Sequence, residues 1–511
     1  MENTTLIGAL NVSFLKFKDK KAICFLRDGK TETEIDYRML MEDSVKLAAH
    51  IHSFGVCRGD RVLLILPKSL FFIVSHLAIQ YLGAVSVPLN PGFKEDELRF
   101  FIKDSNPVLA VTGDAESITI NKVDPVLKQL VVNCDAPYQD LNCIPENPKP
   151  PSIVHVDPDD ASLIIYTSGT TGLPKGAVLS HRNLVHDASR IMDFWEIAKT
   201  DVLCHVLPLY HIHGLCFALH TTLLAGSTAV MLDSFSPELV ANLLSPGKHH
   251  LLCNVFMAVP VMYEKLIRYL KKNNYKFSGL RLITSGSAPL SPRAFKKIHK
   301  LFGIEPVERE GMSETGMNFS NPLTGPRKPG SIGVAMPGVS VRVVDVKTFD
   351  DVMPGEVGEI WLKSTGIVSG YWNKPKETAE TFMDGWFRTG DLGRYDEDGY
   401  YFLTDRLKYI IISGGENISP KEIETTLNRM DGIIDSCVFG LADEIWGEKI
   451  VAAVIKKNDY RIDASAVKKY CKAKLHDWKC PKEVIFIEEM PRNAMGKILN
   501  KELKRLFTER T

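Results

Sequence analysis

The sequence RVLLILPKSLFFIVSHLAIQYLGAVSVPLN, residues 61–90, contains the pattern of one complete βαβ unit. An aliphatic run at 61–67 is followed by a helical pattern at 69–83 and by a second aliphatic run at 84–90. Such alternation places parallel strands in one sheet beneath covering helices. Lys68, His76 and Gln80 interrupt the apolar residues, so the segment falls short of the about 20 apolar residues that a membrane span needs. We therefore expect a buried strand, helix and strand, and no transmembrane segment.

The same alternation returns at residues 203–230 and 251–283. From residue 338 the pattern changes to short strands separated by turns. The segments VSVRVVD (339–345), GEIWLKS (358–364) and GYYFLTD (399–405) predict a small antiparallel sheet or barrel. After Asp405 the pattern is that of a compact α+β unit. The sequence thus predicts a multidomain α/β and α+β protein. Residues 1–404 form a body of two α/β subdomains plus a small β-barrel-like lobe, and residues 405–511 form a small α+β domain.

Composition excludes several classes of protein. The chain has 511 residues, 62 Lys plus Arg and 62 Asp plus Glu, so no net charge favours nucleic acid as a partner. The ten cysteines form no C-x-x-C pair, which argues against a metal knuckle or a disulfide framework. Residues 1–20 lack the apolar core of a signal peptide. We expect a cytoplasmic protein.

A loop rich in glycine and hydroxyl groups, YTSGTTGLPKG at residues 166–176, directly follows the apolar run SLIIY. Backbone N–H groups, hydroxyls and the Lys175 ammonium in such a loop can bind a polyphosphate. The loop is not a Walker A motif, because Pro174 precedes the lysine and Gly176 follows it. Taken alone, the motif could also be a flexible surface loop.

Five further motifs follow in order: SGSAPL (285–290), GMSETG (311–316), RTGDL (388–392), DRLKYIIISGGENISP (405–420) and PRNAMGK (491–497). With the loop at 166–176 they resemble the adenylate-forming superfamily, which includes acyl-CoA synthetases, luciferases and the adenylation domains of peptide synthetases. The resemblance extends from residue 59 to residue 497. It implies an enzyme that uses ATP to form an acyl-AMP from a carboxylic acid, releases pyrophosphate, and passes the acyl group to CoA.

The resemblance also implies roles for individual residues in binding ATP and Mg²⁺. Glu314 is expected to be a catalytic residue and the Mg²⁺ ligand, because a hard cation prefers carboxylate oxygen. Lys497 is expected to stabilise the charge that develops on the transferred phosphoryl group. The β- and γ-phosphates are assigned to Thr167, Ser168, Gly169, Thr170, Thr171, Gly172 and Lys175. The rest of the nucleotide is assigned to Gly286, Ser287, Ala288, Glu310, Gly311, Met312, Ser313, Asp391 and Arg406, with Asp391 at the ribose.

Glu310 is a departure from the family pattern. The family has at this position a tyrosine that stacks on adenine, and a carboxylate has no stacking face. Either another group covers the base, or adenine is held through Gly286, Ser287 and Ala288. For the second half-reaction, Asp405 is expected to be the hinge of a mobile C-terminal domain. Gly414 and Gly415 would let backbone pack closely against the pantetheine arm of CoA.

The acyl site is expected at His211, Val259, Lys265, Ser287 and Met317, with His211 a catalytic residue beside the reacting carboxylate. The strings PLYHIHGL, SGSAPL and SETGMNFSNPLTG look most like the malonyl-CoA synthetase branch. In that branch an arginine meets the second carboxylate, and here Lys265 stands in its place. The alternatives are that Lys265 lies on the solvent face of its helix and that the acid is a fatty acid. His213 is interpreted as a satisfied core histidine.

Three further alternatives remain open at this stage. The chain could load a carrier protein instead of CoA, or it could be a non-catalytic nucleotide-binding relative because of Glu310. It could also act as a homodimer.

Overall fold

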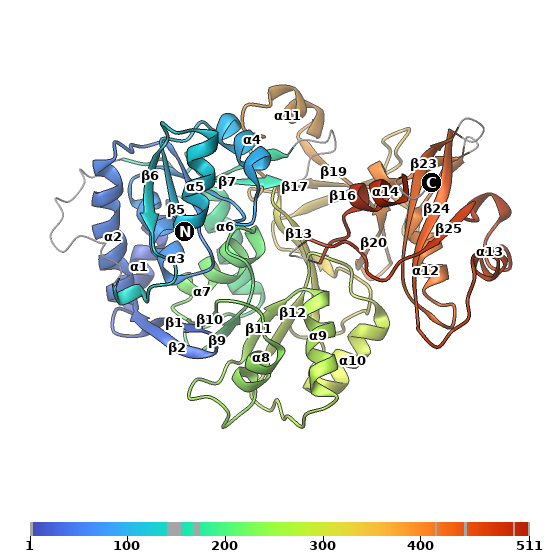
Figure 1. Cartoon of the computed structure of the whole chain (residues 1–511), viewed down its shortest axis with the longest axis horizontal. Helices are drawn as coiled ribbons and strands as arrows, with labels where there is room; N and C mark the ends of the chain where they lie inside the picture. The colour runs from blue at the N-terminus through green and yellow to red at the C-terminus, as the bar shows by residue number, and fades with distance from the viewer. Residues whose placement is uncertain are drawn as a thin grey trace. The chain divides into compact units, whose positions relative to one another are not determined.

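The computed structural model of the chain describes residues 4–140, 155–167, 174–413, 416–443, 447–493 and 496–508. It divides into two compact units, here called unit 1 (residues 1–340 and 363–387) and unit 2 (residues 341–362 and 388–511). Figure 1 labels their elements. The predicted fold class is confirmed, because α/β sheets, a small antiparallel sheet and an α+β unit follow one another along the chain. The domain boundary at residue 405 stays a prediction.

The first sheet of unit 1 has six strands and contains the βαβ unit of residues 61–90. β3 (Arg61–Ile65) and β4 (Val85–Pro88) are parallel neighbours, and α3 (Leu70–Tyr81) connects them. Ser69 begins the helix by accepting a hydrogen bond from the Phe72 N–H. The strand order is β6-β5-β3-β4-β7-β8, with β5 at Leu109–Gly113, β6 at Lys128–Val132, β7 at Ala161–Thr167 and β8 at Lys175–Ser180.

Alternate residues of β3 build the core on one face of this sheet. Leu63 and Ile65 pack in one hydrophobic cluster with Leu98 and Phe101 of α4 (Glu95–Ser105) and with Ile120 of α5 (Asp114–Val123). β7 and β8 are antiparallel, and the pair Thr167 and Lys175 is the last in their register. The hairpin therefore presents both ends of the predicted phosphate loop, whose residues 168–173 lie outside the described residues.

The second sheet of unit 1 has nine strands in the order β15-β14-β13-β12-β11-β9-β10-β1-β2. Its strands are β1 (Lys21–Arg27), β2 (Lys30–Asp36), β9 (Val202–His205), β10 (Thr228–Leu232), β11 (Val255–Ala258), β12 (Leu282–Ser285), β13 (Val307–Met312), β14 (Gly316–Ser320) and β15 (Val334–Ala335). The runs at 251–283 form strands as predicted. The hairpin β1–β2, which joins this sheet beside β10, was not predicted.

Helices surround the two sheets of unit 1. α8 (Pro237–Leu244), α9 (Pro260–Leu270) and α10 (Pro292–Phe302) lie together beside β11 and β12 (Figure 1). The others include α1 (Leu6–Lys16), α2 (Tyr37–Ser53), α6 (His181–Phe194) and α7 (Thr221–Leu224). The segment η2 (His213–His220) is a π-helix, a rare form that is found frequently at functional sites. No sequence pattern had indicated it.

Residues 340–406 contain the small antiparallel sheet predicted for the lobe. Its order is β16-β17-β19-β18, and β20 also pairs with β19. The strands are β16 (Ser340–Val344), β17 (Gly358–Lys363), β18 (Phe382–Met383), β19 (Trp386–Tyr395) and β20 (Tyr401–Arg406), and α11 (Pro375–Thr381) precedes β18.

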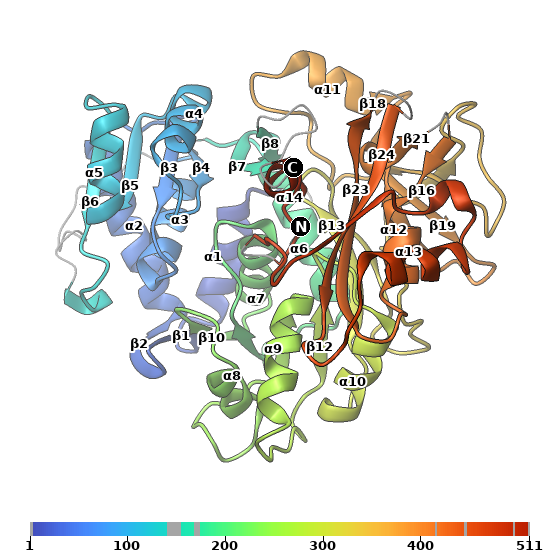
Figure 2. The same cartoon turned by 45° about the vertical axis from the view of Figure 1, so that its right-hand side comes forward.

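The C-terminal part of unit 2 is a sheet covered on both faces. Figure 2 shows its two long strands, β23 (Ile433–Asp443) and β24 (Gly447–Lys456), side by side. Val438 packs with Ile423 and Val467 of α12 (Pro420–Leu427) and α13 (Ala464–Lys472), whereas Phe439 packs with Phe507 of α14 (Asn500–Thr508). The remaining strands are β21 (Ile411–Ser413), β22 (Glu416–Ile418) and β25 (Glu483–Phe486). The predicted helices and strands of this part are present.

No helix within the described ranges is both long and apolar enough to cross a membrane.

Candidate active site

Glu314 lies in the tight turn that joins β13 to β14, and the local backbone explains the glycine that follows it. Gly316 has φ +70°, and a Cβ there would lie 2.0 Å from Oδ2 of Asp187. The turn therefore requires glycine at this position. Glu314 is buried, with 7% of its surface exposed. The sequence GMSETG thus fixes the direction of one carboxylate.

The ends of the predicted phosphate loop meet this carboxylate. The Thr167 hydroxyl donates a hydrogen bond to Oε1 of Glu314 at 3.0 Å, and the Tyr371 hydroxyl donates to the same oxygen at 3.2 Å. The Lys175 ammonium lies 5.0 Å from the centre of the Tyr371 ring. The structure therefore brings together three predicted residues, Thr167, Lys175 and Glu314. Ser168, Gly169, Thr170, Thr171 and Gly172 lie outside the described residues.

The chemistry of this group fits Mg²⁺. Both hydrogen bonds described for the Glu314 carboxylate reach Oε1, and the surrounding atoms are carboxylate and hydroxyl oxygens, which a hard cation prefers. Tyr371 had not been predicted, because nothing in the sequence near residue 371 indicates that the chain returns to Glu314.

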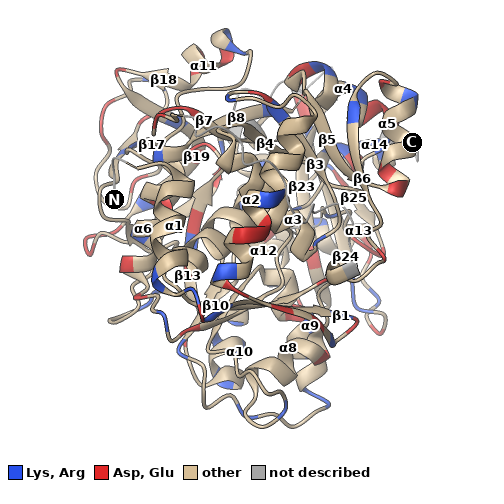
Figure 3. Cartoon of the chain, turned by 90° about the vertical axis from the view of Figure 1, so that its left-hand side faces the viewer, with Lys and Arg blue, Asp and Glu red and all other residues tan. Residues whose placement is uncertain are grey.

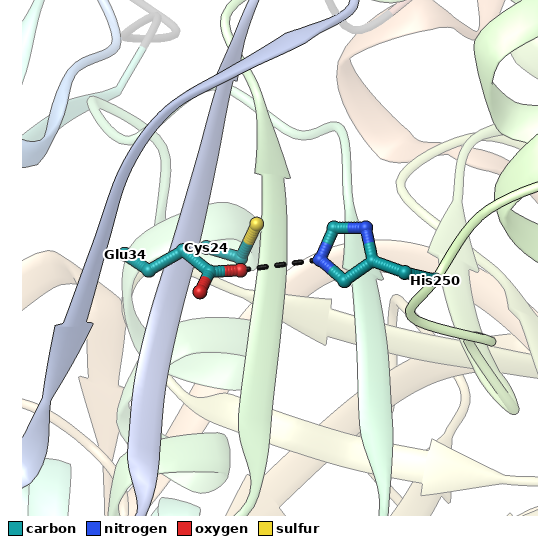
Figure 4. Close-up of side chains that lie close together, drawn as sticks. All are labelled: Cys24, Glu34 and His250. Atoms are coloured by element: carbon teal, nitrogen blue, oxygen red, sulfur yellow. Dashed lines mark hydrogen bonds and ion pairs between the residues drawn. The ribbon is translucent and has the colours of Figure 1, made fainter.

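Cys24, Glu34 and His250 form a second group of potential metal ligands, with ligand atoms all within 4.8 Å of one another (Figure 4). His250 lies 3.2 Å from Oε1 of Glu34, and the Lys21 ammonium forms an ion pair with that oxygen at 2.6 Å. Sulfur and imidazole do not suit Mg²⁺. Because Lys21 already neutralises the carboxylate, we assign this group no part in the reaction.

The segments assigned to the base meet at the end of β13. A Cβ at Gly286 would lie 2.5 Å from Nε of Arg309, and one at Gly311 would lie 2.6 Å from the carbonyl oxygen of Gly316. Both glycines are therefore required by close packing. The Glu310 carboxylate accepts a hydrogen bond from Nδ2 of Asn318 at 3.1 Å. Ala288, Met312 and Ser313 are half-buried.

Ser287 connects this region to the predicted acyl site. Its φ is +67°, which is uncommon for a residue with a side chain and is found mostly where function requires it. Its hydroxyl lies 3.2 Å from Nδ1 of His213. Nε2 of His213 is buried and has no hydrogen-bond partner among the described residues. The interpretation of His213 as a satisfied core histidine is therefore only half right.

His211 lies just before the π-helix. Its carbonyl oxygen accepts hydrogen bonds from the N–H groups of Gly214 and Leu215, at 3.1 and 3.0 Å. Burial lowers the pKa of His211 to about 4, so its half-buried ring is neutral at neutral pH. Val259 caps the start of α9 and is buried, as is Met317 on β14.

Arg309 is the residue of this region that sequence reasoning missed. Its side chain is only 3% exposed, and Nε and Nη2 have no hydrogen-bond partner within the described parts of the chain. The guanidinium lies 5.4 Å from the centre of the Phe217 ring. Burial lowers its pKa to about 10, so it remains charged at neutral pH. The signal in the sequence was the charged run Glu308–Glu310 inside a central strand.

Lys265, predicted to meet a second carboxylate, is exposed on α9. This is the alternative stated above, in which the lysine lies on the solvent face of its helix. A buried charge without a partner is expensive, whereas an exposed ammonium is hydrated. Arg309, unlike Lys265, is a buried cation whose Nε and Nη2 have no hydrogen-bond partner among the described residues.

Unit 2 carries the other predicted residues. Arg406 forms an ion pair with Asp391, with Nε at 2.5 Å from Oδ1 and Nη2 at 3.3 Å from Oδ2, across paired positions of β19 and β20. The Asp405 carboxylate accepts hydrogen bonds from the Lys421 N–H at 3.0 Å and from the Ser419 hydroxyl, so it ties β20 to the start of α12.

Lys497 follows a small loop in unit 2. Its N–H donates to Oδ1 of Asn493 at 2.9 Å, and its carbonyl oxygen accepts from the Asn493 N–H at 2.9 Å. The loop thus fixes the backbone of Lys497. Gly414 and Gly415 lie outside the described residues.

Comparison with known proteins identifies the family. The model of the AMP-binding enzyme family matches residues 11–372, and that of the AMP-binding enzyme C-terminal domain matches residues 422–497. The chain belongs to this family. The predicted resemblance to adenylate-forming enzymes is therefore confirmed.

Individual relatives match over almost the whole chain. The long-chain-fatty-acid–CoA ligase of Bacillus subtilis (strain 168) is 30% identical over 100% of this chain and 96% of its own length. The mitochondrial malonate–CoA ligase ACSF3 of Mus musculus is 34% identical over 92% and 87%. The ATP-bound crystal structure of MatB from Rhodopseudomonas palustris has a TM-score of 0.90 and 34% identity, covering 99% of each chain.

Replacing Glu314 with Gln should lower ATP–pyrophosphate exchange by roughly a hundredfold and raise the Mg²⁺ concentration needed for half-maximal rate, because the amide removes the anionic ligand. The matched control is Glu308→Gln on β13, the strand that leads into the Glu314 turn. Burial raises the pKa of Glu308 to about 8, so at neutral pH the amide replaces a mostly neutral acid and the exchange rate should change little. An equal loss of exchange rate in both variants would show that the exchange depends on the folding of this region and not on the charge of Glu314.

Glu308 should also make the stability of the protein depend on pH. Its pKa is about 8 in the folded protein, against an ordinary value of 4.5, so between these values the folded chain holds a proton that the unfolded chain has lost. The free energy of unfolding therefore falls as pH rises across this window, by at most about 5 kcal/mol. In Glu308→Gln the apparent melting temperature should fall less over the same window. An unchanged pH profile in the variant would contradict the assignment.

Proposed function

We propose that the protein activates a short dicarboxylic acid of the malonate type with ATP and transfers its acyl group to CoA. The reaction class was predicted from the sequence, and the family match and the named relatives confirm it: the protein is an AMP-forming acid–CoA ligase. The identity of the acid is our proposal.

The observation that carries the proposal is the buried guanidinium of Arg309. It lies beside the SGSAPL segment and the π-helix, since Gly286 packs on its Nε and the Phe217 ring centre is 5.4 Å from the guanidinium. Its two unpartnered nitrogens can donate to both oxygens of a carboxylate, which is the geometry that a guanidinium favours.

A fatty acid fits this arrangement less well. An alkyl chain would leave Nε and Nη2 of Arg309 without a hydrogen-bond acceptor, at a cost of about 1–3 kcal/mol. A second carboxylate removes that cost. The names of the relatives include both malonate and long-chain fatty acids, so Arg309 and not the names supports the choice.

In the first step the other carboxylate attacks the α-phosphorus of ATP, and the bond from that phosphorus to the oxygen bridging to the β-phosphate breaks. Thr167 and Lys175 are proposed to bind the departing pyrophosphate, and Lys497 is proposed to stabilise the charge on the α-phosphoryl group. Mg²⁺, held by Glu314, would neutralise phosphate charge. Asp391, with Arg406, is proposed to bind the ribose hydroxyls. The CoA thiol then attacks the acyl carbon and AMP leaves.

CoA is proposed as the acceptor in preference to a carrier protein, because the relatives described above are named CoA ligases. Two further proposals, a homodimer and a cytoplasmic location, rest on the sequence alone.

The acid should be identified by CoA- and ATP-dependent release of AMP with malonate, methylmalonate, acetate, octanoate, palmitate and an aryl acid. We expect malonate or methylmalonate to give the highest kcat/KM. Preference for octanoate or palmitate would overturn the dicarboxylate proposal. Pyrophosphate exchange without AMP release would instead indicate a carrier protein as the acceptor.

Replacing Arg309 with Met should lower kcat/KM for malonate by about a hundredfold, since two charged hydrogen bonds are lost, and leave that for propionate unchanged or higher. The kcat/KM of Arg309→Lys for malonate should lie between those of the unchanged protein and of Arg309→Met, because lysine keeps the charge but lacks the planar, two-pronged guanidinium. The melting temperature of Arg309→Met without substrate should change little, because the burial cost of the guanidinium is removed together with its attraction to Glu310.

The control is Arg281→Met. Arg281 is paired with Asp201 through Nε at 2.7 Å, so its loss should destabilise the protein without changing the ratio of malonate to propionate. If Arg309→Met lowers kcat/KM equally for malonate and propionate and also lowers the melting temperature, Arg309 has only a structural role.

A further inference from the structure

The charges of this chain are balanced overall but not along the segment that forms α9 and α10. Residues 260–303 contain ten Lys and Arg and a single acidic residue, Glu264, whereas the whole chain has 62 of each sign. Elsewhere in unit 1 the signs are mixed, as the blue and red segments on α2 and α4 show in Figure 3. The segment therefore concentrates positive charge.

The two helices place these charges on one exposed face. Tyr263 and Phe302 pack edge to face with ring centres 6.3 Å apart, which joins α9 to α10 on the buried side. Arg268, Lys271, Arg293, Lys296, Lys297 and Lys300 are all exposed, and we call them the α9–α10 basic face. The pKa of Lys297 is lowered by partial burial and then by the nearby charges of Arg293 and Lys271, while Glu264 acts in the opposite direction.

Glu264 is the one carboxylate of the segment, and it opposes only part of this positive charge. Among the described residues, none of the six cations forms an ion pair, in contrast to Arg281, which binds Asp201. A hollow of about 430 Å³ is lined by Pro292 and four of the cations, Arg293, Lys296, Lys297 and Lys300. Like charges gathered in this way repel one another, so an anionic partner would be stabilised by all of them at once.

We propose that the α9–α10 basic face binds an anionic membrane surface by electrostatic attraction. Four of the six cations are lysines, whose compact charge suits a diffuse anionic surface better than bidentate recognition of a single phosphate. No large hydrophobic side chain of residues 260–303 is exposed. The face therefore has no aromatic platform for stacking nucleic acid bases and no apolar wedge for inserting into the bilayer.

The proposal does not depend on which acid the enzyme activates. Binding to a charged bilayer requires several basic residues near the surface, and each contributes a factor of about five to the partition coefficient. The attraction weakens with salt, because the exposed charges are screened within a Debye length.

The test is flotation of the full chain with phosphatidylcholine vesicles, with and without phosphatidylserine, at low and high salt. We expect binding only to vesicles that contain phosphatidylserine, and loss of binding at high salt. The variant Lys296→Glu/Lys297→Glu/Lys300→Glu should lower the partition coefficient on the order of a hundredfold. Ligase activity without vesicles should be unchanged, which shows that the variant is folded.

The matched control is Lys469→Glu/Lys472→Glu/Lys474→Glu, which makes the same change in charge at exposed positions at the end of α13. This control should still bind the vesicles. The proposal would be overturned if the protein did not bind anionic vesicles, or if both triple variants lost binding equally. Binding of RNA in place of vesicles would also overturn it.

Discussion

The active site of unit 1 depends on one buried ion pair, between Asp187 and Arg190 of α6. Burial raises the pKa of Asp187 to about 6, so the carboxylate is still ionised at neutral pH and binds Nη2 of Arg190 at 2.6 Å. Asp187 also accepts a hydrogen bond from the Met317 N–H at 3.1 Å, and Arg190 donates to the Met317 carbonyl oxygen at 2.8 Å. α6 thereby fixes the backbone N–H and the carbonyl oxygen of Met317, which lies just after the Glu314 turn.

The same helix also holds the segment that supplies Tyr371. Nδ2 of Asn183 donates to the carbonyl oxygen of Thr365 at 2.8 Å, and the Val368 N–H donates to the carbonyl oxygen of Glu314 at 2.9 Å. α6 thus connects Glu314, the strand that follows it and the approach to Tyr371. A carboxylate that must bind a cation in a fixed direction requires such support, because a loose ligand would lose most of its advantage over water.

The sequence predicted local structure and the nucleotide motifs well, and it missed the long-range partners. The run at 61–90 encodes its own strands and helix, because periodicity depends on neighbouring residues. The motifs indicated Thr167, Lys175 and Glu314 as parts of one site, and the structure brings them together. Neither periodicity nor spacing could pair Asp187 with the backbone of Met317 or bring Tyr371 to Glu314, since these contacts depend on how distant segments pack. Lys265 was assigned because it stands where the resembled branch has an arginine, and the sequence did not reveal that this lysine is exposed whereas Arg309 is buried.

In the proposed reaction, Arg309 would also hold the acyl-AMP intermediate in place. His213, whose pKa is lowered well below its ordinary value by burial and then by the charge of Arg309, is neutral, and burial lowers the pKa of His211 to about 4. In the proposed reaction, a malonate-type acid enters with two negative charges and loses one when its reacting carboxylate becomes an acyl-AMP. The second carboxylate keeps its charge through both half-reactions. Its pairing with Arg309 would therefore persist after the reacting end has become neutral, so the acyl group stays anchored until the thiol attacks.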